Sequence, residues 1–112
     1  MEYSDDKWKA VIAFLETRFD KEMDIKAILF ILGIQSLGRP SDEFSKEEKM
    51  DLMNLGFCEI AALSGFFVKA DEDKDGWPIW NQAKALPKMS TKEQEQFIKA
   101  HVIKYFESEA LI

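Results

Sequence analysis

Apolar residues recur at helical spacing in four parts of this chain, which predicts four amphipathic helices. In the first part, residues 5–19, Asp5 and Asp6 suit a helix N-terminus. Its apolar residues are Trp8, Val11, Ile12, Leu15 and Phe19. The second part, about residues 22–37, is apolar nearly all round, which predicts a buried helix at the centre of the fold. Gly38, Arg39 and Pro40 then supply a C-terminal glycine and a helix breaker.

Two capping boxes predict where the other two helices begin. Ser45 stands three residues before Glu48, and Ser90 three before Glu93, so each side chain of a pair can satisfy the other's backbone N–H. For the third helix, which Gly65 is placed to end, the predicted inward residues are Met50, Met53, Phe57, Ile60 and Ala61. For the fourth, which runs nearly to the C-terminus, they are Phe97, Ile98, Val102, Tyr105 and Phe106.

A β-hairpin is predicted between the third and fourth helices. Residues 65–70 (GFFVKA) and 77–84 (WPIWNQAK) are short runs, rich in aromatic and β-branched residues, on either side of an acidic stretch that contains glycine. Pro78 has no N–H to donate to a neighbouring strand, so the second strand is expected to be an edge strand there, with its proline facing away from the partner strand. The expected fold is mostly α within the α+β class, with one hairpin before the last helix.

Length and composition predict one folded domain over residues 1–112. The chain is long enough for a single core, and 46% hydrophobic residues are too many for a disordered segment. Cys58 is the only cysteine, which excludes an internal disulfide and fits a reducing compartment. The sequence shows no signal peptide, and its longest apolar run is far shorter than a membrane span, so we expect a cytoplasmic protein without membrane contact.

The net charge of −6 argues against binding to nucleic acid, whose phosphates attract lysine and arginine. The order of three helices, a hairpin and a fourth helix nevertheless matches a winged helix-turn-helix with the hairpin as wing. Its would-be reading helix has more acidic than basic residues: Glu47, Glu48, Asp51 and Glu59 against Lys46 and Lys49. A divergent winged-helix nucleic-acid binder therefore stays an alternative.

The stretch DEDKDG begins as a calcium-binding EF-hand loop does. Asp71, Asp73 and Asp75 alternate and Gly76 follows, which matches loop positions 1, 3, 5 and 6. Position 12, normally a bidentate glutamate, is Gln82, and the flanking segments are typical of strands rather than helices. A solvated hairpin turn is the leading interpretation, and calcium binding through residues 71–82 is the alternative.

Two tryptophans follow the acidic stretch. Trp77 and Trp80 are three positions apart, so on a regular strand they point to opposite faces and one of them is exposed. An exposed tryptophan on an edge hairpin is typical of protein interfaces. In the other interpretation, a twist or bulge lets both rings pack onto the helices. We predict contacts with a partner through Trp77, Trp80 and Phe67.

The residues needed for catalysis are sparse. The chain has one histidine and one cysteine, and neither a phosphate-binding glycine loop nor a nucleophile elbow. His101 is typical of a helix residue at the core edge or surface, and Cys58 of a small buried apolar residue. We expect no enzyme and no cofactor.

The segments LFILGIQSLG (29–38), EEKMDLMN (47–54) and DGWPIW (75–80) together resemble a family of small uncharacterised bacterial proteins over residues 20–112. The resemblance implies a bacterial, cytoplasmic, single-domain protein, and it implies no activity or site residue. Our functional hypothesis is a non-enzymatic protein-interaction module, either a homodimer or the partner of another protein, that uses its aromatic hairpin.

Overall fold

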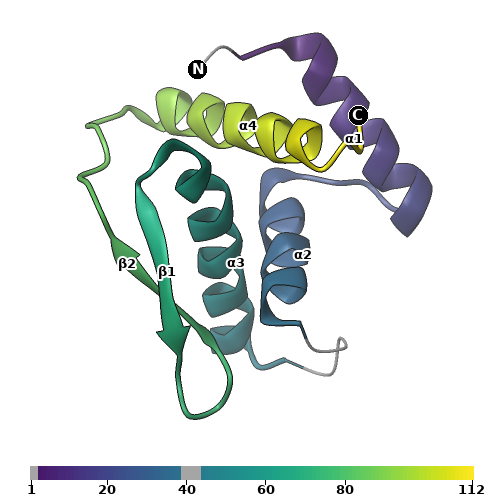
Figure 1. Cartoon of the computed structure of the whole chain (residues 1–112). Coiled ribbons are helices and arrows are strands. Elements are labelled where there is room, and N and C mark those ends of the chain that lie inside the picture. Colours follow the sequence, from purple (N-terminus) through teal and green to yellow (C-terminus); the bar gives the residue numbers. More distant parts are fainter. Residues whose placement is uncertain (1–2, 39–43) are drawn as a thin grey trace. The chain divides into compact units, whose positions relative to one another are not determined.

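Four helices and one two-stranded antiparallel hairpin make up the fold, in the predicted order (Figure 1). The computed structural model describes residues 3–38 and 44–112. The expected α+β class is confirmed, and no helix in this part of the chain is long and apolar enough to cross a membrane. The two ends of the chain, up to Ile25 and from Pro87, form one compact unit, and residues 26–86 form another. The single domain over residues 1–112 stays a prediction.

The first unit contains α1 (Asp5–Phe19) and α4 (Thr91–Ser108). The predicted capping box opens α4, where Ser90 and Glu93 each bond the other's backbone N–H. The rings of Phe14 and Phe106 meet edge to face at 5.8 Å between their centroids, which joins the two helices. Apolar packing between segments from the two ends of the chain therefore holds this unit together.

Two details near the start of the chain differ from the prediction. Phe19 was expected on the buried face but is 45% exposed, because α1 ends there and Asp20 turns the chain into the left-handed region. The second helix, α2 (Ile25–Leu37), begins three residues later than expected. Met23, which was expected to lie in α2, belongs to the connection between α1 and α2. Its N–H donates to the carboxylate of Glu16 on α1.

His101 on α4 is buried rather than at the core edge, with 3% of its surface exposed. Its ring lies 4.1 Å from that of Phe97, and its Nδ1–H donates to the Phe97 carbonyl at 2.7 Å. Burial lowers the pKa of the imidazole, the Phe97 carbonyl opposes that shift, and Lys104 adds to it. The folded chain therefore holds His101 neutral under conditions in which the unfolded chain protonates it.

We expect the free energy of unfolding to fall as the pH drops below about 6.5, where histidine in the unfolded chain takes up a proton. Above that pH both states are neutral at this position, and the contribution is constant. Urea unfolding at pH 5.5, 6.5 and 7.5 measures the slope. In His101→Gln the slope over this range should be smaller, and an unchanged slope would assign it to other groups.

The second unit contains α2, apart from its first residue, together with α3 (Lys46–Ala61) and the hairpin. Among the thirteen residues of α2 only Lys26 and Gln35 are exposed, as expected for a helix that is apolar nearly all round. Gly38 closes α2 with a φ of 73°, a conformation that glycine adopts without a steric penalty. The predicted breaker at Arg39 and Pro40 lies outside the described residues.

Two glycines, one on each helix, let the backbones of α2 and α3 come into contact where the helices cross. A Cβ on Gly33 of α2 would lie 1.8 Å from the Leu52 carbonyl oxygen, and one on Gly56 of α3 would lie 2.1 Å from that of Leu29. Leu29, the earlier residue of α2, meets Gly56, the later residue of α3, whereas Gly33 meets Leu52. The two helices therefore run antiparallel at this crossing. Each helix thus packs its glycine against the other's backbone, where no larger residue fits.

This crossing corrects the buried face predicted for α3. The predicted box of Ser45 and Glu48 does cap the helix, and Ile60 and Ala61 are buried as expected. Met50, however, is 58% exposed, and the buried residues are Leu52, Leu55, Gly56, Ile60 and Ala61. The close approach at Gly56 turns that side of the helix inward. After Ala61 a short 3-10 turn (Ala62–Ser64) leads to Gly65, whose φ of 80° ends the helical segment.

Candidate functional site

The hairpin consists of β1 (Phe67–Glu72) and β2 (Pro78–Gln82). Phe67 opposes Gln82 and Lys69 opposes Trp80, so these four side chains share one face. On that face the ring of Phe67 meets Phe57 of α3 edge to face at 6.2 Å. The predicted contact residue Phe67 is thus partly buried, and it anchors the hairpin to the helix.

Trp77 and Trp80 pack against the same apolar cluster, formed by Leu37, Leu52 and Leu55. Both side chains are partly buried, so neither is the exposed strand residue that alternation predicts. Trp77 lies just before β2, so the alternation of side chains along the strand does not determine where its ring points. The strand register also shifts between Lys69 and Glu72, which is an irregularity next to the turn. The alternative interpretation, in which an irregularity lets both rings face the helices, describes the structure.

The two indoles differ in their surroundings. The Nε1–H of Trp80 is buried and, within the described residues, has no hydrogen-bond partner, which costs about 1–3 kcal/mol for a neutral group. Trp77 instead borders an open cavity and can present part of its ring to a ligand. Of the two predicted anchors, only Trp77 lines this cavity.

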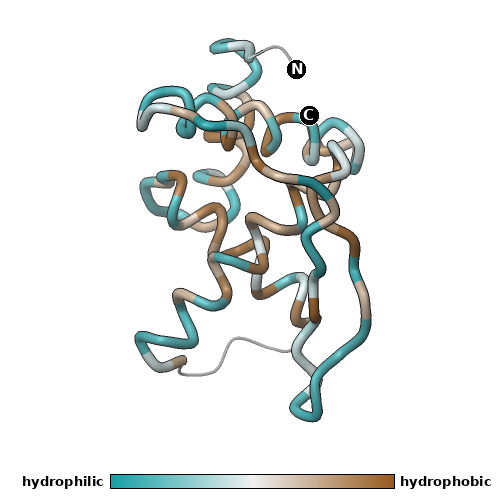
Figure 2. The backbone as a smooth tube through the Cα atoms, turned by 90° about the vertical axis from the view of Figure 1, so that its left-hand side faces the viewer, coloured by the Kyte–Doolittle hydropathy of each residue, from teal (hydrophilic) through white to brown (hydrophobic). Residues whose placement is uncertain are grey.

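The acidic stretch forms the hairpin turn, the hydrophilic tip in Figure 2. Asp73 organises it: its carboxylate accepts the N–H of Asp75 at 2.8 Å and that of Trp77 at 3.0 Å, and its carbonyl accepts the N–H of Gly76. Gly76 has a φ of 83°, which favours glycine. Asp71 lies on β1, and its carboxylate accepts the N–H of Glu72. The stretch is a hydrogen-bonded turn, as the leading interpretation expects.

The candidate ligands of the calcium alternative, Asp71, Asp73 and Asp75, are not grouped as a metal site in this turn. Across residues 3–38 and 44–112, no three histidine, cysteine or acidic side chains are grouped so as to hold a metal ion. Asp73 directs a carboxylate oxygen to backbone N–H groups, and Asp71 belongs to the strand. Calcium coordination through Asp71, Asp73 and Asp75 would require this hairpin end to rearrange.

We therefore expect the same melting temperature in excess EDTA and in millimolar calcium. A ligand at a thousand times its dissociation constant stabilises the folded state by about 4 kcal/mol, which raises the midpoint of a domain this size by several degrees. Magnesium serves as the control for ionic effects. A rise specific to calcium would contradict this expectation and restore residues 71–82 as a metal loop.

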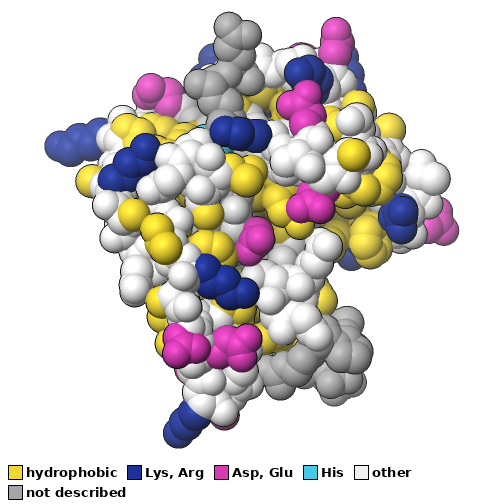
Figure 3. Space-filling view, in the orientation of Figure 1, with side chains coloured by type: hydrophobic (Ala, Val, Ile, Leu, Met, Phe, Trp, Pro, Cys, Tyr) yellow, Lys and Arg dark blue, Asp and Glu magenta, His cyan; other side chains and the backbone are white. Residues whose placement is uncertain are grey.

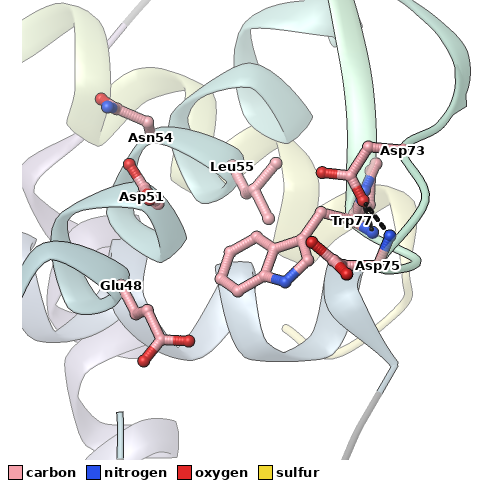
Figure 4. A pocket seen from close by; sticks show the side chains of 8 residues that line it. Glu48, Asp51, Asn54, Leu55, Asp73, Asp75 and Trp77 are labelled. Atoms are coloured by element: carbon pink, nitrogen blue, oxygen red, sulfur yellow. Dashed lines mark hydrogen bonds between the residues drawn. The ribbon is translucent and has the colours of Figure 1, made fainter. Parts of the chain in front are cut away.

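A cavity of about 470 Å³ lies between α3 and the hairpin turn, and it is the candidate site. Figure 4 shows the Trp77 indole between carboxylates of α3 and carboxylates of the turn. The residues that line the cavity are Glu48, Asp51, Asn54, Leu55, Asp73, Asp75, Trp77 and Pro78. The site brings the predicted residues Trp77, Asp73 and Asp75 together, whereas Asp71, Trp80 and Phe67 do not line it.

Four carboxylates and no basic residue line this cavity, so it attracts cations. Two of them also have structural roles, because Glu48 belongs to the capping box and Asp73 holds the turn. Asp51 and Asp75 take part in neither ion pair found in the described chain, which join Lys7 to Glu107 and Lys99 to Glu95. Both are exposed, which leaves them accessible to a cationic ligand.

Sequence reasoning missed the contribution of α3 to this site. Glu48, Asp51 and Leu55 follow helical spacing and so share a face, which could have been read from the sequence. Their meeting with a turn that lies beyond the end of α3 in the chain depends on how the hairpin packs, which no local pattern encodes. On the face shown in Figure 3, acidic side chains gather near the hairpin turn.

Cys58, the other candidate reactive residue, is half-buried on α3, and burial together with the neighbouring Glu59 raises the pKa of its thiol. A raised pKa leaves less of the nucleophilic thiolate at neutral pH. Its environment is therefore the opposite of that of an activated cysteine.

Comparison with known proteins assigns no family to this chain: no family model, curated protein or solved structure matches it.

Proposed function

We propose that this chain is a non-enzymatic protein-interaction module, cytoplasmic as its sequence predicts, that holds an arginine side chain of a partner in the pocket between α3 and the hairpin turn. The proposal rests on one observation: one indole and four carboxylates line the same cavity, which is open to solvent. A cation over a tryptophan face gains about 0.5–1 kcal/mol at an exposed site, and each exposed charge pair up to about 1 kcal/mol.

Arginine suits this pocket better than lysine. Its guanidinium is planar, stacks on an aromatic face and can donate two parallel hydrogen bonds to a carboxylate. Asp51 on the helix and Asp75 on the turn lie on opposite sides of the Trp77 ring (Figure 4). We expect a guanidinium stacked on the indole to pair with the carboxylate of Asp51 or of Asp75.

The experiment is a titration of the ¹⁵N-labelled protein with a hexa-arginine peptide, followed by NMR. We expect the indole N–H of Trp77 and the amides of Asp51 and Asp75 to shift together and saturate, with a dissociation constant in the millimolar range. Raising the salt from 50 to 500 mM should weaken binding, because exposed charges are screened. Shifts spread evenly over all surface acids, or none, would contradict the proposal.

Control ligands in the same titration separate the alternatives. Hexa-lysine has the same charge without the planar group and should bind more weakly, whereas a hexa-glycine peptide should not bind. A short DNA duplex should cause no shift, and saturable binding of the duplex would favour the winged-helix alternative instead. A homodimer would appear in light scattering as twice the mass of the 13.0 kDa chain.

A further inference from the structure

We draw no further inference here: the strongest candidate, the outward face of the β1–β2 hairpin with Val68 57% and Ile79 40% exposed, carries nothing because nothing in the structure shows what covers it.

Discussion

Replacing Gly33 with alanine should destabilise the protein by about 2 kcal/mol, although alanine is the better helix former. In an ordinary helix interior this substitution gains about 1 kcal/mol. Here the new methyl group would lie 1.8 Å from the Leu52 carbonyl oxygen, and backbone on the neighbouring helix cannot rotate away as a side chain can. Overpacking of this kind costs about 1–3 kcal/mol and sometimes more.

Urea unfolding measures this effect as a lower midpoint with an unchanged slope. Gln35→Ala is the matched control, since Gln35 lies on the same helix and is exposed, and it should change stability by no more than about 0.5 kcal/mol. Gly33→Ala with a higher midpoint would show that α2 and α3 do not meet as closely as described.

The reciprocal geometry adds a sharper test with Gly56→Ala. Either substitution alone must push the helices apart at one shared crossing, after which the second methyl group finds part of its space already open. The double variant should therefore lose less stability than the two single losses added together, as is typical of residues in one contact. Strict additivity would contradict the shared crossing.

In the pocket, the variant Asp51→Asn/Asp75→Asn should weaken hexa-arginine binding about tenfold, which corresponds to about 1.4 kcal/mol. Neither carboxylate is needed for the capping box or for the turn's hydrogen bonds, so the fold should persist. The control Glu47→Gln/Glu72→Gln removes the same charge from α3 and β1 outside the lining, and should have a much smaller effect.

The aromatic wall is tested separately with Trp77→Leu, which keeps an apolar side chain against Leu52 and Leu55 but removes the cation-binding face. Binding should weaken several-fold, and the preference for arginine over lysine should decrease. Equal losses from the charge variant and its control would mean that only net charge attracts the peptide, and the pocket would then have no role.

The sequence predicted those parts of the fold that local chemistry determines. The N-termini of α3 and α4 follow from Ser45 and Ser90, because a capping box is complete within four residues. Counting hydrophobic residues placed Met50 inside and overlooked Gly56, since a glycine contributes no apolar surface although it permits the backbone of α2 to approach closely. The face of a helix that becomes buried depends on its neighbour as well as on its own residues.

The same limit applied to the candidate site. The turn chemistry of Asp73 and Gly76 is local, and the sequence indicated it correctly. The aromatic and β-branched residues after Trp77 predicted that it lies in a strand, but the strand begins one residue later, at Pro78. The pocket exists only because this turn packs near the first turns of α3, and such long-range packing leaves no mark in either segment taken alone.

The way the chain divides into units also bears on the order in which the protein can fold. Residues 26–86 are contiguous, so this unit can complete its packing while the remainder is still being synthesised. The other unit pairs Phe14 with Phe106 across that entire insertion, a contact of high sequence separation that forms slowly. During synthesis, Val11 and Leu15 of α1 therefore lack their final packing until α4 has emerged, and in that interval they expose apolar surface of the kind that favours aggregation.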